Sequence, residues 1–169
     1  EALAAQLSLT EMARFGLLAT RVLTLQQRWP EAIARAEAAL QLAHQAGLHG
    51  GHARTFEVRV AMALAGAGRH GEAAARLEAL DPLLLGMQRQ LNMAIAGVLR
   101  HRAAGGDAAA LARALSAARE ASFHTLLQAV PPVIARICDE ALALDIESAF
   151  VRELIVHQVC ATFSDHALV

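Results

Sequence analysis

Three histidines that lie close together are the densest group of residues in the sequence that could bind a metal. They are His44, His49 and His52, with two glycines between the last two. Neutral imidazoles bind zinc, but a structural zinc site usually needs four ligands, and this stretch holds no cysteine or carboxylate. A protonated histidine near a helix C-terminus also interacts favourably with the helix dipole. The spacing therefore favours loop or capping histidines over a metal site, and we expect no cofactor.

The other reactive side chains have simpler interpretations. Glu72 and Asp107 fall in the first turns of two helices, where negative charge is favourable. A catalytic carboxylate pair would need the two about 5 to 9 Å apart, and they begin different helices. Cys138 lies on an apolar helix face and reads as a small buried hydrophobe. Trp29 precedes Pro30 at a turn, which it is expected to fasten rather than to stack on a ligand. We therefore expect no catalytic residue and no enzyme activity.

Composition narrows the class of protein further. The 169 residues include 15 basic residues, all of them Arg, against 16 acidic residues, and this balance argues against direct nucleic-acid contact by bulk charge. Alanine, the strongest helix former, occurs 40 times. No apolar run is long enough to span a membrane and no signal peptide is recognisable, so we expect a cytoplasmic location without membrane contact. The first residue is Glu1 rather than Met, which indicates a segment of a longer protein.

Capping signals and apolar spacing predict an all-α chain. Ser8 and Glu11 form a capping box, Pro30 suits the first turn of a helix, and Asp81-Pro82 resembles an N-cap followed by a first-turn proline. Asp107 is expected to cap a further helix. The predicted helices lie at about residues 9–27, 30–47, 52–67, 72–80, 82–104, 108–121, 131–144 and 147–157. Short connections between them predict antiparallel hairpins.

The hairpins repeat along the chain. The stretches that begin at Arg28, Gly68 and Gly106 occupy the same place in three helix-turn-helix units, and Glu31 and Glu72 are 41 residues apart. Such periods in helical pairs are typical of an α-solenoid, in which each unit packs only on its neighbours. We expect one domain over residues 1–157, with units at about 9–47, 52–81, 82–121 and 123–157, followed by a tail or linker at 158–169. For the stretch after Gln158 a final helix docked on the last hairpin is the open alternative.

Several residues resemble the tetratricopeptide family. They are Val60-Ala61 and Leu64 in one helix, Gly68 at the turn, Glu72-Ala73 at the start of the next helix, and Leu80-Asp81-Pro82 at its end. The spacing is longer than that family's usual period of about 34 residues, so the chain resembles a longer-repeat, tetratricopeptide-like array. The resemblance implies a right-handed superhelix in which the first helix of each pair lines the concave face.

The segment from Cys138 to Ile155 resembles the end of the helical-repeat region in bacterial regulators of the maltose-regulator (MalT) type. These are signal-transduction ATPases that often carry a DNA-binding domain of the LuxR family. In that family the superhelix is the sensor, which receives an inducer or a partner protein. The chain has no phosphate-binding loop, so the resemblance implies the sensor segment and not the ATPase module.

The implied concave face is the best candidate for a binding site. Mapping the repeats onto it gives an apolar strip with arginine at both ends: Arg14, Leu17, Arg21, Thr55, Val58, Met62, Met93, Ala96 and Arg100. Methionine adapts its shape and arginine pairs with carboxylates, so this strip suits an extended peptide or an amphipathic helix with acidic flanks. The opposing interpretation is that neighbouring helices bury these residues.

The sequence therefore favours a non-catalytic interaction or sensing segment of a bacterial transcription regulator, which binds a protein or peptide partner or a small-molecule inducer. Two alternatives remain at this stage: a free-standing scaffold or adaptor that binds a peptide or helix, and a small all-α metal-dependent hydrolase. Flanking domains in the full-length protein would distinguish a regulator segment from a free-standing adaptor. Convergence of the histidines in space would be required for the hydrolase. Apolar end faces of a short solenoid could also support a dimer.

Overall fold

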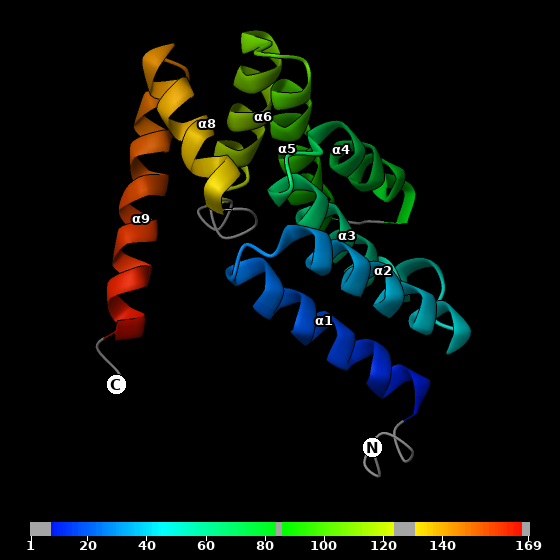
Figure 1. Ribbon diagram of the computed structural model, residues 1–169. Coiled ribbons are helices and arrows are strands. Elements are labelled where there is room, and N and C mark those ends of the chain that lie inside the picture. Colours follow the sequence, from blue (N-terminus) through cyan, green and yellow to red (C-terminus); the bar gives the residue numbers. More distant parts are fainter. Residues whose placement is uncertain (1–7, 84–85, 124–130, 167–169) are drawn as a thin grey trace. The chain divides into compact units, whose positions relative to one another are not determined.

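The computed structural model describes residues 8–83, 86–123 and 131–166, and the regular structure of these segments is entirely helical (Figure 1). Their α-helices are α1 (Leu9–Leu25), α2 (Trp29–Gln45), α3 (Arg54–Gly66), α4 (His70–Ala79), α5 (Gly86–Ala103), α6 (Ala108–Glu120), α8 (Pro131–Ala143) and α9 (Ser148–His166). The same segments contain the short 3-10 helices η2 (Gly50–His52) and η3 (Asp81–Leu83). The all-α prediction is thus confirmed for the described residues. None of these helices is long and apolar enough to cross a membrane.

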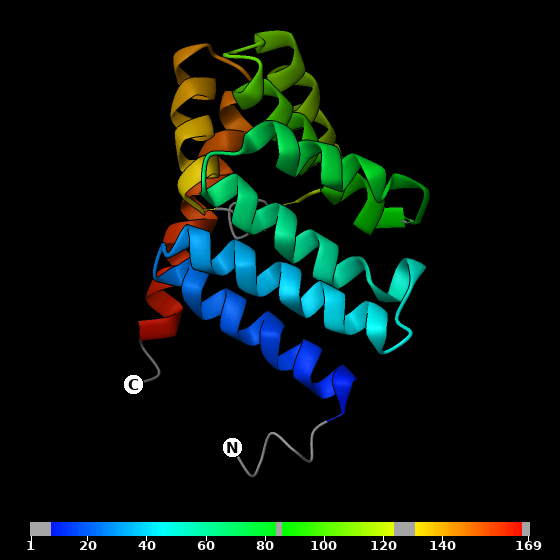
Figure 2. The same ribbon diagram turned by 45° about the vertical axis from the view of Figure 1, so that its right-hand side comes forward.

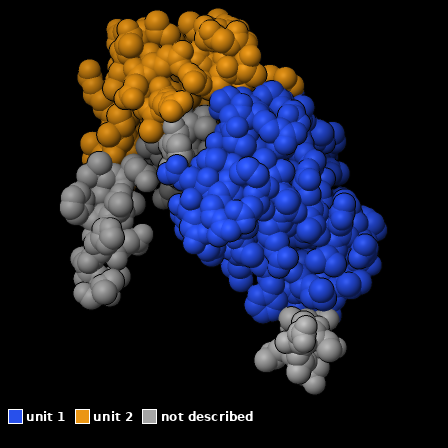
Figure 3. Space-filling model, viewed as in Figure 1, with its two compact units in different colours: residues 1–84 blue, residues 85–169 orange. Residues whose placement is uncertain are grey.

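The chain divides into two compact units, residues 1–84 and residues 85–169 (Figure 3). In the first unit α1 and α2 form one antiparallel hairpin, α3 and α4 form a second, and α3 also packs on α2 and α1. Figure 2 shows these four helices side by side in chain order. In the second unit α5 pairs with α6, and α8 pairs with α9. Sequential antiparallel pairs, as the short connections predict, therefore build both units.

Most of the helices end in the same way. The second residue after the helix adopts a left-handed conformation, at Gln27, Gly47, Gly68, Gly105, Ser122 and Asp145. The next residue then donates its N–H to the carbonyl five positions earlier, as Arg69 does to Leu64 at 2.9 Å. This Schellman arrangement satisfies carbonyl groups that the end of a helix would otherwise leave open. It also turns the chain sharply enough for the next helix to run back along the previous one.

Each hairpin of the first unit has the same kind of ion pair at the start of its second helix. Arg69 donates through Nε and Nη2 to the two carboxylate oxygens of Glu72, at 2.7 and 2.6 Å, and Arg28 binds Glu31 through the same pair of nitrogens. The two glutamates are 41 residues apart, so this local ion pair recurs at the spacing noted in the sequence. The helix α6 begins differently, because the Asp107 side chain accepts from two backbone N–H groups of its first turn, at 3.0 and 3.1 Å.

Small residues allow the helices of each hairpin to approach closely. A Cβ on Gly16 of α1 would lie 2.6 Å from the Cβ of Ala39 on α2, and a Cβ on Gly97 of α5 would lie 2.9 Å from the Cβ of Ala114 on α6. Real Cβ atoms essentially never come this close, so each position requires glycine unless the helices separate. Ala39 and Ala114 are themselves buried. The high alanine content is thus used at crossings where larger side chains would push the helices apart.

Trp29 joins the two hairpins of the first unit. Its ring covers Gly66 on α3 so closely that a Cβ there would collide with three ring atoms. This contact explains the tryptophan as a packing residue, in line with its expected role at the turn. It also fixes α2 against α3 near the first turn of one helix and the last turn of the other.

The start of the fifth helix differs from the prediction. Asp81-Pro82 was expected to open a helix over 82–104, but these residues form η3, and α5 begins at Gly86. The N–H of Leu83 donates to the carbonyl of Leu80 at 2.9 Å and closes a single tight turn around the proline. Proline is as compatible with such a turn as with the first turn of a helix, so its presence did not distinguish the two.

The last helix is longer than the sequence analysis expected. It was predicted to end near His157, but α9 continues to His166, so residues 158–166 belong to this helix. No glycine or proline occurs between His157 and His166, and the chain therefore contains no signal that would end the helix there.

We predict that Gly66→Ala destabilises the protein by about 1–3 kcal/mol, because the added methyl group forces the Trp29 ring from its position. In a Trp29→Ala background the same substitution should be neutral or stabilising, since the ring is gone and alanine is the better helix former. Urea denaturation of the four variants of this cycle measures the difference. Equal effects of Gly66→Ala in both backgrounds would contradict the packing role given to Trp29.

Candidate functional site

The strip expected from the sequence falls into two parts. Arg14, Leu17 and Arg21 lie on α1 and Thr55, Val58 and Met62 lie on α3, all in the first unit; Met93, Ala96 and Arg100 lie on α5 in the second unit. Because α1 and α3 pack side by side, the first six residues belong to adjacent helices. Each part is described separately below.

Exposure separates the candidates of this strip. Arg14, Arg21 and Thr55 are exposed, whereas Leu17 and Val58 are half-buried. Met62 is only 5% exposed and Ala96 only 2% exposed, so both lie in the helix packing and present almost no surface to a ligand. The sequence pattern placed them on the strip because helical spacing identifies a face but does not show which part of that face a neighbouring helix covers.

The structure adds Arg59, which the sequence analysis did not single out. It lies on α3 one residue after Val58 and four after Thr55, so the three share one side of the helix. Its Nε atom is buried and has no hydrogen-bond partner. Burial, and secondarily the positive charge of Arg21, lower the pKa of Arg59. A basic residue within an otherwise apolar and alanine-rich helix segment was the signal available in the sequence.

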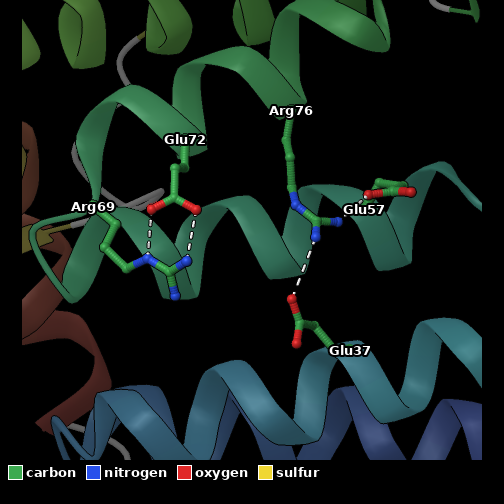
Figure 4. A network of polar contacts seen from close by, with 5 residues as sticks. All are labelled: Glu37, Glu57, Arg69, Glu72 and Arg76. Carbon is green, nitrogen blue, oxygen red and sulfur yellow. Dashed lines mark hydrogen bonds and ion pairs between the residues drawn. The ribbon is translucent and has the colours of Figure 1, made fainter.

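Arg21 and Arg59 form no ion pair with any carboxylate of the described segments. Other arginines of the first unit are paired. Arg76 on α4 contacts Glu57 on α3 at 2.9 Å and Glu37 on α2 at 3.3 Å (Figure 4). Among its described residues the first unit therefore supplies counter-ions at Arg76 but provides none for the two neighbouring cations where α1 lies beside α3. Guanidinium groups in this arrangement can bind a carboxylate or a phosphate.

The second part of the strip borders a pocket between α5 and α6. The pocket has a volume of about 300 Å³, and Met93 and Arg100 line it together with Gly97, Arg113 and Ala114. This volume is at the lower end of the range for small-molecule sites. The residues combine an apolar floor with guanidinium groups, so this part also suits an anionic group on an apolar stem.

The histidines do not assemble into a metal site within the described segments, where no three His, Cys, Asp or Glu side chains converge. The rings of His44 and His49 instead stack with their centroids 5.7 Å apart. His44 also lines a pocket of about 330 Å³ next to η2, together with Glu57 and Arg76. Both of these charged residues already form the ion pair described above.

The remaining reactive residues have structural roles. Glu72 forms an ion pair with Arg69 in the first unit, and Asp107 caps α6 in the second unit. Cys138 is buried, and burial raises the pKa of its thiol to about 11, so the thiol stays protonated at neutral pH. A protonated thiol is a poor nucleophile.

The second unit has a buried polar centre where α5 meets α8. The His101 side chain is fully buried; its Nδ1 lies 2.7 Å from the carbonyl oxygen of Asp107, and its Nε2 lies 3.1 Å from Oε1 of Glu140. Arg102 approaches the other oxygen of Glu140 at 3.3 Å. The contact with His101, and after it the positive charge of Arg102, lowers the pKa of Glu140.

Comparison with known proteins found no matching family model, no matching curated protein and no matching solved structure.

We predict that Glu140→Gln destabilises the protein by about 1–3 kcal/mol at pH 7, because a buried ring nitrogen loses its charged partner. Since the pKa of Glu140 is lowered in the folded state, its contribution is fully present above the pKa of an unfolded glutamate, about 4.3, and is lost as the pH falls through the folded-state value. The stability difference should therefore narrow below about pH 4. Urea titrations from pH 3 to pH 7 measure it.

Glu120→Gln on α6 provides the control, because this side chain is exposed and lies outside the His101 centre. A pH-independent difference between the wild type and Glu140→Gln would show that the carboxylate acts through its shape and not through its charge.

Proposed function

We propose that this chain is a non-catalytic interaction or sensing segment whose face on α1 and α3 binds a partner that carries carboxylates. In this proposal the helix pairs belong to a right-handed, tetratricopeptide-like α-solenoid within a cytoplasmic bacterial transcription regulator of the maltose-regulator type. The ligand is an acidic peptide of a partner protein or an anionic small-molecule inducer. The repeated antiparallel hairpins and the sequence resemblance at residues 138–155 support this proposal.

The observation that carries the proposal is the pair Arg21 and Arg59. A buried guanidinium nitrogen without a hydrogen-bond acceptor is unfavourable, because the group has lost water and gained nothing in exchange. The neighbouring Arg21 adds repulsion between like charges. A carboxylate bound between them would supply the missing acceptor and cancel the repulsion. The free protein thus carries an unfavourable arrangement that an anionic ligand relieves.

The half-buried apolar residues beside the arginines give the ligand its other requirement. Leu17 on α1 and Val58 on α3 lie on the same two helices as the cations. A ligand that combines a carboxylate with an apolar stem could contact both kinds of residue, as peptides do. Exposed Thr55 offers a hydroxyl for a further hydrogen bond.

A ligand held by both helices would favour one relative position of α1 and α3. Such a ligand shifts the population toward the arrangement that it binds better, by an amount set by its difference in affinity for the two arrangements. Because α3 also packs on α2 and α4, a change at the α1–α3 contact would shift the packing of all four helices of the first unit. The segment would transmit a signal in this way without catalysing a reaction.

The proposal predicts that the purified chain binds an acetylated and amidated hexaglutamate peptide, with an affinity that falls as salt is added. Arg59→Gln should weaken binding by about tenfold or more, since a hydrogen bond to a charged group contributes about 1.5–3 kcal/mol. Isothermal titration calorimetry measures the affinity. Thermal unfolding of the same variant should show unchanged or increased stability, because removing an unpaired buried charge costs the fold little.

Arg35→Gln is the matched control, because Arg35 is an exposed arginine on α2 and not on either of the two helices that carry the proposed site. If Arg35→Gln weakens binding as much as Arg59→Gln, the peptide responds only to total charge and the proposed site is wrong. Equal affinity of the wild type and Arg59→Gln would also show that the proposed site is wrong.

A further inference from the structure

The pocket between α5 and α6 lies over a close crossing of these two helices. Gly97 on α5 faces Ala114 on α6, and a Cβ on Gly97 would lie 2.9 Å from the Cβ of Ala114. Both residues also line the pocket, whose volume is about 300 Å³. Because one of them has no side chain and the other has only a methyl group, the surface above the crossing is hollow where longer side chains would fill it.

The two ends of this pocket differ in chemistry. The helices run antiparallel, so residue numbers rise along α5 and fall along α6 (Figure 1). Met93 lies one turn before Gly97 and Ala117 lies one turn after Ala114, so both line the same end. Arg100 lies one turn after Gly97 and lines the opposite end. The pocket thus has an apolar end and a cationic end, which are about 10 Å apart because a helix rises about 1.5 Å per residue.

The charges that border the pocket are of one sign. Among the described residues that line it, Arg100 on α5 and Arg113 on α6 are basic and none is acidic. Arg113 is exposed and forms no ion pair with a carboxylate of the described segments. A guanidinium group can bind a carboxylate through two parallel hydrogen bonds. The pocket therefore favours a ligand whose charged end is anionic.

We propose that this pocket binds a small carboxylate that carries a short apolar chain. The carboxylate lies toward Arg100 and Arg113, and the chain lies toward Met93 and Ala117. Since a water molecule occupies about 30 Å³ in the liquid, a volume of about 300 Å³ holds about ten heavy atoms. A carboxylate takes three of them and leaves about seven for the chain. The flexible side chain of Met93 can adapt to the shape of that chain.

The inference is independent of the function proposed for α1 and α3. The pocket lies entirely within the second unit, whereas Arg21 and Arg59 belong to the first. The ligands differ as well, because an acidic peptide is much larger than this pocket and a simple carboxylate lacks an apolar chain. Each site can therefore be removed by substitution while the other remains.

The test titrates octanoate into the whole chain, with ¹³C-labelled methionine methyl groups observed by NMR. Met93 lines the pocket, whereas Met62 is buried on α3 in the first unit and serves as an internal reference. We expect a saturable shift of the Met93 methyl resonance with a Kd of about 0.1–1 mM, as is usual for so small a ligand, and no shift of Met62. Acetate, which has the charge without the chain, and 1-octanol, which has the chain without the charge, should give no saturable shift at the concentrations at which octanoate saturates.

Substitutions at the two ends of the pocket test the orientation of the ligand. Arg113→Gln should weaken octanoate binding by about tenfold, since it removes a charged hydrogen-bond donor. Its matched control is Arg136→Gln, at an exposed arginine of α8. Ala117→Leu should weaken binding by at least about tenfold, because the larger side chain fills the apolar end. Its control is Ala135→Leu on α8, and since all four positions are exposed, the variants are expected to fold, which circular dichroism checks.

Several outcomes would overturn the inference. One is the absence of a saturable shift of Met93, and another is an equal shift of Met62, which would show unspecific binding. Binding of 1-octanol as tight as that of octanoate would show that the cationic end takes no part. Unchanged affinity of Ala117→Leu would place the ligand outside the pocket. Arg59→Gln should leave octanoate binding unchanged, and a loss of binding in that variant would place octanoate at the site proposed on α1 and α3.

Discussion

The close approach of helices at small residues is the constraint on which the remaining structure depends. Where Gly16 meets Ala39 and Gly97 meets Ala114, one additional methyl group would separate the helices of a hairpin. Because these crossings are tight, the backbones of adjacent helices leave little room between them, and longer side chains are forced to the faces of the layer. Arg59 is one such longer side chain: it is half-buried, and its Nε is buried without a hydrogen-bond acceptor.

Local signals in the sequence predicted the local structure well. The capping box of Ser8 and Glu11 is present at the start of α1, and Asp107 caps α6 as expected. These predictions succeeded because a cap depends on residues within a single turn. The predicted start of the fifth helix was wrong, because proline fits both a tight turn and the first turn of a helix. The extent of α9 was missed because no residue after His157 marks an end.

The candidate site was less predictable, for a physical reason. Helical spacing showed which residues share a face, but burial depends on neighbours far away in the sequence. Met62 was assigned to an open strip and is buried, whereas Arg59, on the same side of α3, was overlooked. The distinction between a paired arginine such as Arg76 and an unpaired one such as Arg59 exists only in three dimensions, since Glu37 and Glu57 reach Arg76 from two other helices.

Arg76 also has a consequence for how the first unit unfolds. In a simple helical array each helix contacts only its neighbours in the chain, and the ends can melt while the middle persists. The guanidinium of Arg76 on α4 reaches past α3 to Glu37 on α2 and so joins helices that are second neighbours (Figure 4). Each exposed ion pair contributes little alone. Their shared donor nevertheless couples the loss of one hairpin to weakening of the other, which favours unfolding of the first unit as one cooperative block over fraying helix by helix.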